Sequence, residues 1–169
     1  MQRIYLFLAI TILIPLLASA RAQTTPAPET GQFDFWIGNW KCSGESYAAN
    51  GKTQHTEATN SIKRILGGHV VQESFKAQGF NGTSMSVYVP AAKQWRQTWV
   101  DDGGGYIALK GGMADGKMIL STDVGPKGGL ARMVFHNISH AAFDWDWEKS
   151  SDQGKTWKLA WHLHYTRVD

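Results

Sequence analysis

The chain has 169 residues, a formal net charge of +3 and a single cysteine, Cys42. One cysteine cannot form an internal disulfide bond, so the fold must depend on its apolar core, and we expect Cys42 to be buried and inert. The Lys and Arg residues are scattered along the chain without a basic run. This distribution argues against a nucleic-acid partner.

Residues 1–22 have the layout of a secretory signal peptide. Arg3 precedes a nearly uncharged apolar run, and Ala20-Arg21-Ala22 matches an A-x-A cleavage pattern. The alternative is an N-terminal membrane anchor, because the apolar run is nearly long enough to span a bilayer. No later stretch of the sequence is long and apolar enough to do so. We therefore expect a periplasmic or secreted protein with no membrane span after signal cleavage.

Residues 23–32 follow as a linker whose prolines and small polar residues favour an extended chain. The remaining residues, 33–169, have the length of a single domain and are numerous enough to bury a core. This domain opens with four large aromatic side chains in the eight residues FDFWIGNW. We expect a short helical turn around Phe33–Trp36, which plugs one end of the fold.

After this turn, glycine-rich turn signals separate short segments in which apolar and polar residues alternate. No stretch keeps a helical period for three turns, and this pattern is typical of all-β folds. A meander of ten antiparallel strands has two exposed edges unless it closes, so we predict a closed up-and-down barrel. The candidate strands are residues 37–48, 52–65, 69–79, 83–90, 94–101, 105–112, 117–124, 129–138, 140–149 and 156–167.

Alternation along the strands also assigns the inward side chains. Aromatic faces are expected to point inward, because leaving each large ring in water forgoes about 2 kcal/mol or more. The barrel interior is therefore predicted to be rich in tryptophan. The predicted inward residues are Trp40, Cys42, Val71, Glu73, Phe75, Trp95, Gln97, Trp99, Phe143, Trp145, Trp147, Trp157, Leu159, Trp161, Leu163 and Tyr165.

The first strand begins with a G-x-W motif, Gly38-Asn39-Trp40. A tryptophan at this place often caps one end of a closed barrel beneath an arginine of the last strand, and Arg167 is the obvious partner here. A guanidinium group over the indole face would add about 1 kcal/mol. We expect Gly38 to form the bend between the helical turn and the strand.

The segment SSDQGKTW, residues 150–157, matches the S-x-D-x-G-x-T-W pattern of an Asp-box turn. Asp152 can accept hydrogen bonds from the turn, Gly154 can take a positive φ, and Trp157 can pack the hairpin shut. A propeller needs several such repeats, and one copy in a short chain cannot build one. We interpret the segment as a stable hairpin turn.

His162 and His164 form an H-x-H pair on the last strand, which places both rings on one face about 7 Å apart. This spacing can bind a metal or a haem iron. Alternation places both rings outside the barrel, across from Asp144 and Asp146, so hydrogen-bonded exterior histidines are the simpler interpretation. We therefore predict no metal site, with His162 and His164 as weak candidates.

No known catalytic signature occurs in the sequence, and two inward polar residues carry more information. Glu73 and Gln97 fall on faces that are otherwise apolar, and a buried carboxyl group needs a donor, a water or a ligand. Arg132 is a candidate partner for Glu73. An apolar cavity with a few polar groups is typical of a small-molecule site, whereas a polar network that ties strands together is the equal alternative.

Five stretches of the chain, FDFWIGNW, ILGGHVVQESF, QWRQTWVDDGGGYIALKGG, DGKMILS and the closing SSDQGKTW…YTR, occur in this order between Phe33 and Arg167. Together they resemble the uncharacterised DUF1579 family, which is similar to the calycin superfamily of lipocalins, fatty-acid-binding proteins and nitrobindins. The resemblance implies a closed barrel with an internal cavity but no known activity. Nitrobindin-like proteins hold haem through a histidine near the end of the chain, a place comparable to His162 or His164.

From these patterns we predict an exported barrel that binds a small, largely apolar molecule. The predicted ligand-binding residues are Glu73, Gln97, Trp95, Trp99, Trp145 and Trp161. We predict no cofactor, and haem bound through His162 or His164 is the first alternative. A packed barrel with a structural or interaction role is the second. An enzyme that uses Glu73 as an acid or base is the third, since a buried Glu with a raised pKa suits such chemistry.

Overall fold

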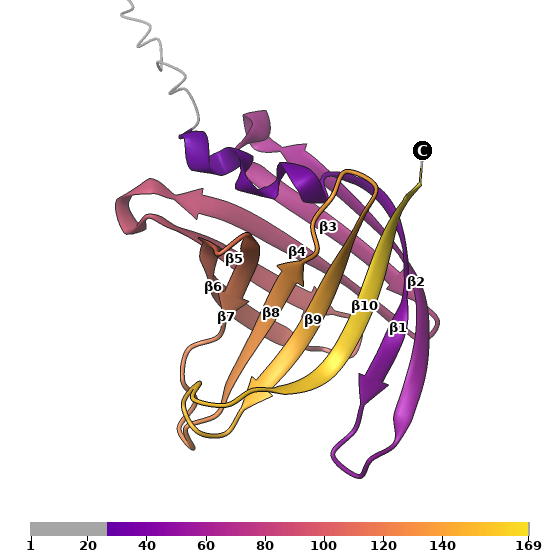
Figure 1. Ribbon diagram of the computed structural model, residues 1–169. Coiled ribbons are helices and arrows are strands. Elements are labelled where there is room, and N and C mark those ends of the chain that lie inside the picture. The colour runs from indigo at the N-terminus through magenta and orange to yellow at the C-terminus, as the bar shows by residue number, and fades with distance from the viewer. Residues whose placement is uncertain (1–26, 169) are drawn as a thin grey trace, which may run out of the picture.

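The computed structural model describes residues 27–168, so the predicted signal peptide and the first part of the predicted linker lie outside the described residues. Ten antiparallel strands form a closed barrel, as the sequence predicts (Figure 1). The elements are η1 (Pro28–Trp36), β1 (Gly38–Tyr47), β2 (Thr53–Ile65), η2 (Leu66–Gly68), β3 (Val70–Ala77), β4 (Phe80–Val89), η3 (Pro90–Ala92), β5 (Gln94–Asp101), β6 (Tyr106–Ala114), β7 (Lys117–Ser121), β8 (Leu130–His136), β9 (Ala142–Ser150) and β10 (Lys158–Val168).

Each strand pairs with its neighbours along the chain, and β1 closes the barrel by pairing with β10. In this closing pair Trp40 lies opposite Arg167, and Cys42 lies opposite Tyr165. The strands therefore have no free edge, which removes the hazard of edge-to-edge association. None of the described helices is long and apolar enough to cross a membrane.

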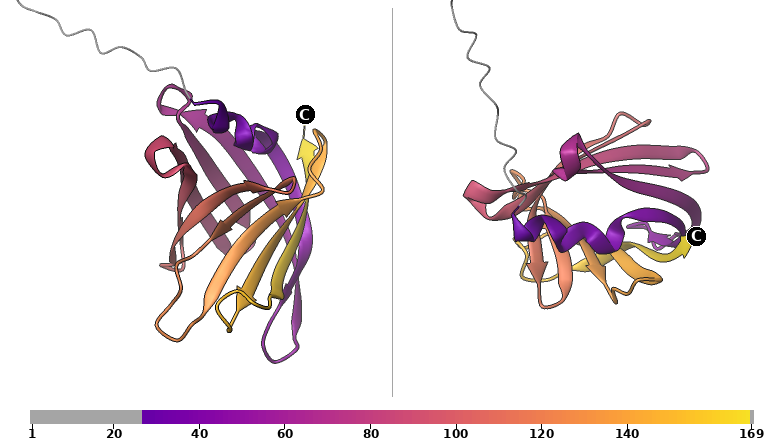
Figure 2. Two further views of the ribbon diagram at one scale, coloured as in Figure 1. Left: turned by 60° about the vertical axis from the view of Figure 1, so that its left-hand side comes forward. Right: turned by 90° about the horizontal axis from the view of Figure 1, so that it is seen from above.

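The 3₁₀ helix η1 lies across one end of the barrel, which we call the plug end (Figure 2). It begins at Pro28, so the expectation that the chain stays extended up to residue 32 is wrong. A proline at the helix start has its fixed φ and missing N–H where neither is costly. Phe33 and Trp36 are buried, and the Phe33 ring meets the Trp95 ring edge to face at 4.7 Å between centroids. This apolar anchoring holds the helix in place.

A capping arrangement around Trp40 joins the two ends of the chain, as predicted. The Arg167 guanidinium lies 4.1 Å from the centre of the Trp40 ring. It also donates hydrogen bonds to the backbone oxygens of Phe35, Ile37 and His140. Gly38 is required beneath it, because φ there is +136° and a β-carbon would lie 2.2 Å from an Arg167 nitrogen.

The inward faces agree with the predicted alternation except at the start of β10. A β-bulge between Leu159 and Trp161 shifts the register there, so that Leu159 lies opposite Glu148 on the outer face. Leu159 is accordingly 41% exposed. Trp157 also lies outside, where the Arg132 guanidinium stacks 3.9 Å from its ring centre. The predicted inward positions of Trp157 and Leu159 are therefore wrong, because an extra residue reverses the alternation.

The SSDQGKTW segment forms the predicted hairpin turn between β9 and β10. Asp152 accepts hydrogen bonds from the backbone and hydroxyl groups of Thr156 and from the Ser150 hydroxyl. These bonds, those from Thr156 first, lower the pKa of Asp152 to about 2. The Trp157 ring closes the turn by donating to the Gly154 oxygen at 3.0 Å.

Candidate functional site

A cavity of about 150 Å³ occupies the barrel interior between η1 and the opposite end, which we call the mouth end. The β3–β4, β5–β6 and β9–β10 turns lie at the mouth end. Trp36 of the plug lines the cavity, as does Asp101 at the last position of β5. Aromatic side chains form most of its wall. Besides Trp36, they are Phe75, Phe80, Trp99, Phe135, Trp145, Trp147, Trp161 and Tyr165.

Edge-to-face contacts set the orientation of these rings. Trp161 contacts Trp145 at 5.4 Å, Phe75 at 5.9 Å and Phe80 at 6.0 Å between ring centroids. The plane of the Trp161 ring is nearly perpendicular to those of Trp145 and Phe75 and steeply tilted to that of Phe80. Such edge-to-face geometry is favoured for aromatic pairs. Trp145 and Trp147 instead stack with an interplanar angle of 11°. The wall is thus a set of mutually positioned rings on β3, β4, β9 and β10.

Trp99 is held at the mouth end by two neighbours. Its indole N–H donates to the Asp101 carboxylate at 3.0 Å, and that carboxylate also accepts from the backbone N–H groups of Gly103 and Gly105. These bonds, that from Trp99 first, lower the pKa of Asp101. The Trp99 ring lies against Gly82, where a β-carbon would sit 2.1 Å from a ring carbon. Glycine at this position therefore makes room for the ring.

Glu73 supplies the buried carboxyl group of the cavity wall, and its side chain is nearly inaccessible to solvent. Its two oxygens accept hydrogen bonds from Asn60 Nδ2 at 2.7 Å and from the Ser84 hydroxyl at 2.6 Å. Asn60 Nδ2 also donates to the Tyr165 hydroxyl at 3.3 Å. Burial raises the pKa of Glu73, and the hydrogen bonds from Ser84 and Asn60 offset only part of this effect.

The expected partner of Glu73, Arg132, is not part of this network. Arg132 lies on the outer face, where its Nε donates to the Glu148 carboxylate and its guanidinium stacks on Trp157. Among the described residues Glu73 has no cationic partner, so no opposite charge offsets the effect of burial on its pKa. Burial also raises the pKa of the neighbouring Cys42 thiol to about 12, as expected of an inert cysteine.

Glu73→Gln is expected to stabilise the protein at neutral pH. A raised native pKa means that the native state binds more protons than the unfolded chain between the two pKa values, so wild-type stability falls as pH rises through that window. Below pH 4.5, the ordinary pKa of glutamate, the carboxyl group is protonated in both states, and the difference in stability due to its ionisation vanishes. The expected gain at neutral pH is about 1.4 kcal/mol for each unit by which the native pKa is raised.

Urea unfolding of both proteins across this pH range measures the effect. Gln can accept from Asn60 and donate to the Ser84 hydroxyl, so the local hydrogen bonds survive. Ser86→Ala, at another buried polar position of β4, is the control and should shift stability without changing its pH dependence. A Glu73→Gln protein that loses stability equally at every pH would show that the pKa of Glu73 is not raised in the native state.

Four of the six predicted ligand-binding residues line the cavity: Glu73, Trp99, Trp145 and Trp161. The other two, Trp95 and Gln97, do not. Trp95 belongs to the plug end, where it packs on Phe33 and donates to the Gln32 side chain at 3.1 Å. Gln97 is buried and donates to the Ser86 hydroxyl at 2.9 Å, so it forms a structural contact between β4 and β5. Both residues point inward as predicted, although neither lines the cavity.

Two indole N–H groups of cavity-lining residues have no hydrogen-bond partner among the described residues. They are Nε1 of Trp36 and Nε1 of Trp161, and both atoms are buried. Buried donors without a partner are rare and costly. An acceptor atom of a guest molecule or of a water would satisfy them.

His162 and His164 lie on the outer face of β10, as alternation predicts. The Nδ1 atom of His162 is 2.7 Å from the Asp146 carboxylate, and Nδ1 of His164 is 2.7 Å from the Asp144 carboxylate. Both rings point away from the cavity. The geometry therefore gives no support to a haem held inside the barrel by either ring.

Several cavity-lining residues are absent from the predicted site. Trp147 shares the inward face of its strand with Trp145, so strand alternation in the sequence could have assigned it to the site. Phe75 was predicted to point inward but was not assigned to the site. Phe80 lies beside the β3–β4 turn, before the predicted start of its strand, so no alternation marked its direction. All three rings line the cavity.

No protein-family model and no curated protein matches this sequence. Solved structures do match. A protein of unknown function from the DUF3598 family of Nostoc punctiforme superimposes with a TM-score of 0.56 at 15% identity, and the match covers 81% of this chain and 49% of that one. The S-type phycobiliprotein lyase CPES from Guillardia theta superimposes with a TM-score of 0.57 at 12% identity, and the match covers 85% of this chain and 99% of that one.

These likenesses show the fold alone, because both identities are low. The chain shares a barrel fold with both proteins, and it spans about half the length of the Nostoc protein. Membership of the DUF1579 family stays a prediction.

Proposed function

We propose that this protein binds a small, largely apolar molecule inside its barrel. One observation carries the proposal: the cavity of about 150 Å³ is walled by aromatic rings and contains a single buried carboxyl group, that of Glu73. A concave, apolar site with a few polar groups is the usual form of a small-molecule site. The alternative of a completely packed barrel would leave no such space.

The volume sets the size of the guest. An apolar cavity of about 150 Å³ in another protein holds a molecule as large as benzene. We therefore propose a guest, or a buried portion of one, with about one ring or a short alkyl chain. A haem or another large planar group would require several wall residues to move.

The polar groups set its chemistry. Burial raises the pKa of Glu73 and so disfavours its charged form, which weakens the preference of this site for a cationic guest. The unpaired N–H groups of Trp36 and Trp161 favour a guest with one acceptor atom, such as a carbonyl or ether oxygen. Because both Glu73 oxygens already accept hydrogen bonds from Asn60 and Ser84, the geometry favours binding over acid–base catalysis by this residue.

The setting of this function is part of the proposal. A signal peptide at residues 1–22 would place the barrel in the periplasm or outside the cell, and the DUF1579-like stretches make it one member of a wider group of such barrels. The calycin-like fold of the two solved neighbours supports a barrel with an interior site.

Native mass spectrometry of the protein purified from its own host tests the proposal. The expected result is a reproducible mass excess over the denatured chain that corresponds to one small organic molecule per chain. The excess should disappear on denaturation, and the released molecule should be identifiable by its mass.

A sample that carries no excess, and that also fails to take up benzene-sized apolar probes, would overturn the proposal. An excess equal to the mass of haem would favour the haem alternative.

A further inference from the structure

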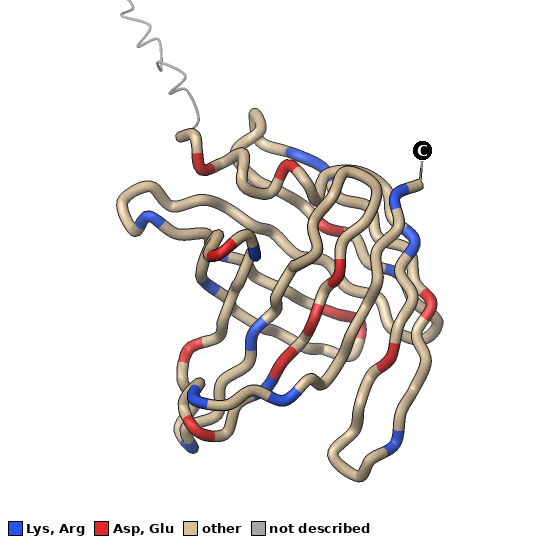
Figure 3. The backbone as a smooth tube through the Cα atoms, in the orientation of Figure 1, with Lys and Arg blue, Asp and Glu red and all other residues tan. Residues whose placement is uncertain are grey.

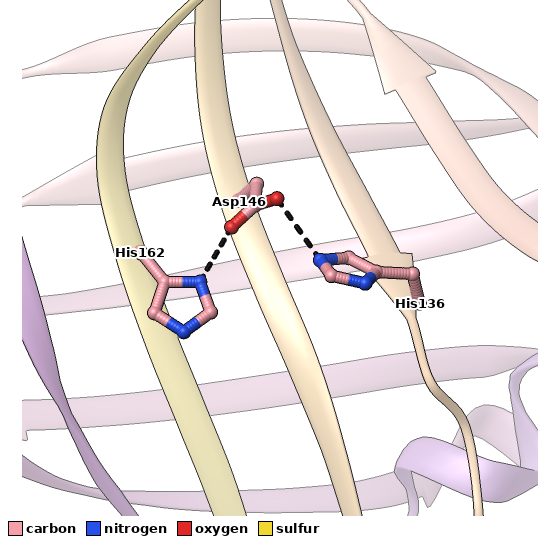
Figure 4. Close-up of side chains that lie close together, drawn as sticks. All are labelled: His136, Asp146 and His162. Atoms are coloured by element: carbon pink, nitrogen blue, oxygen red, sulfur yellow. Dashed lines mark hydrogen bonds and ion pairs between the residues drawn. The ribbon is translucent and has the colours of Figure 1, made fainter.

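A cluster of side chains that can act as metal ligands lies on the outer face of the barrel, on β8, β9 and β10. It consists of His136, Asp146 and His162, and the Asp146 carboxylate lies between the two rings (Figure 4). His136 Nε2 is 2.9 Å from one carboxylate oxygen, and His162 Nδ1 is 2.7 Å from the other. The three ligand atoms all lie within 4.8 Å of one another, and the side chains are half-buried.

Strand pairing fixes this cluster. His162 lies directly opposite Asp146 in the β9–β10 pair. In the β8–β9 pair His136 lies opposite Asp144, so its ring reaches Asp146 diagonally. Three adjacent strands of a closed barrel thus hold the three side chains close together. Binding of a ligand would therefore cost little further conformational entropy.

The charges around the cluster favour a cation. Acidic residues follow one another along β9, as Figure 3 shows. Among the described residues, Asp146 forms ion pairs only with His136 and His162 and with no Lys or Arg. Asp144 accepts from His164 and Asn137, and Glu45, which lies opposite His162 on β1, contacts His55. Arg132 is engaged by Glu148. Asp146 therefore has no permanent positive charge as a partner.

We propose that His136, Asp146 and His162 bind one divalent transition-metal ion of the Zn²⁺ type. Two imidazoles and a carboxylate, with a fourth position for water, form a known tetrahedral zinc ligand set. Ligand atoms around such an ion lie about 3.3 Å apart for bonds of about 2.0–2.1 Å. The two nitrogen–oxygen distances are already shorter than this, and all three ligand atoms lie within 4.8 Å of one another, so the two rings would shift around an inserted ion without a change in strand pairing.

Binding has a defined proton balance. Each ring nitrogen that faces Asp146 must offer its lone pair to the metal, so a proton on that nitrogen moves to the other ring nitrogen of a neutral histidine or leaves a charged one. Uptake therefore depends on pH, because the metal competes with protons for these ring nitrogens.

The ion would lie directly behind the cavity wall. His136 follows Phe135, Asp146 lies between Trp145 and Trp147, and His162 follows Trp161, and all four of these neighbours line the cavity. A paramagnetic ion at the cluster is therefore expected to quench tryptophan fluorescence, a readout that does not require an occupied cavity.

The test is titration of the untagged, chelator-treated protein with Zn²⁺ by calorimetry and with Co²⁺ by visible absorption, both in one buffer at a fixed pH. We expect one ion per chain and the strong visible absorption of four-coordinate Co²⁺. His136→Gln, His162→Gln and Asp146→Asn should each weaken binding at least about tenfold. His164→Gln is the matched control, because it removes a histidine with the same kind of carboxylate contact, and it should leave the affinity nearly unchanged.

A wild-type protein that takes up neither ion overturns the proposal. So does a His136→Gln protein that binds as tightly as wild type, or a His164→Gln protein that loses binding as completely as His162→Gln. Thermal unfolding of each metal-free variant identifies any that fails to fold. If Asp146→Asn fails to fold, the comparison of His136→Gln with His164→Gln decides the outcome.

Discussion

Trp40→Ala is expected to lower the free energy of unfolding by about 3–5 kcal/mol, the largest effect of a single substitution in this account. For a domain of this size, such a loss lowers Tm by roughly 10 °C or more. Thermal and urea unfolding measure both quantities.

The physical reason is that Trp40 joins the plug, the barrel wall and the end of the chain. Its side chain is 1% exposed, and its N–H donates to the Trp36 oxygen at 2.8 Å. The ring meets Phe143 edge to face at 4.8 Å and carries the Arg167 guanidinium on its face. Alanine would leave a cavity and would also remove the surface on which Arg167 stacks.

Trp157→Ala is the matched control. Trp157 is also stacked beneath an arginine, but it lies on the outer face and closes only the β9–β10 turn. Its loss should cost about 1–2 kcal/mol, well below the cost at Trp40. Equal losses at the two positions would mean that the plug does not depend on Trp40.

Met133→Trp is expected to abolish binding of a benzene-sized probe, or to weaken it at least about tenfold, which corresponds to 1.4 kcal/mol. Met133 is buried and lines the cavity from β8. A larger ring at this position would occupy the space of the guest. Fluorobenzene is a suitable probe, and its fluorine NMR signal, titrated against protein, measures the affinity.

Met85→Trp is the matched control for this substitution. Met85 is 41% exposed on the outer face of β4, so the same added ring should leave fluorobenzene binding unchanged. Overpacking of a core costs about 1–3 kcal/mol, and circular dichroism shows whether the Met133→Trp barrel remains folded. Unchanged affinity in a folded Met133→Trp protein would place the probe site outside the cavity.

The closed barrel could be predicted from the sequence because strand alternation and turn residues are local signals. The capping pair of Trp40 and Arg167 could also be predicted, because a G-x-W motif on the first strand and an arginine on the last resemble the cap of calycin-type barrels. The faces of Trp157 and Leu159 could not, because a single bulged residue in β10 reverses the alternation and leaves no mark in composition.

The candidate site was only partly predictable for a related reason. Alternation states which side chains point inward but not their height along the barrel axis. Trp95 and Trp99 share a face of β5, yet Trp95 packs on the plug and Trp99 lines the cavity. The height depends on strand stagger and on where η1 lies, which are properties of the whole barrel.

The outer histidine cluster shows the same limit. His136 lies far from His162 in the sequence, and only strand pairing brings it next to His162 across Asp146. A pattern search along the chain finds the H-x-H pair of β10 instead. Those two rings bind different carboxylates in the structure.

The central claim is that the barrel interior accepts a small apolar guest, and a crystal of the protein soaked with iodobenzene tests it most directly. Anomalous scattering from iodine locates the guest without reference to the protein's own density. The account predicts one iodine peak inside the barrel, among Trp99, Trp145 and Trp161. Crystals that show no interior peak, with side chains filling the space between these rings or iodine bound only on the outer surface, would contradict it.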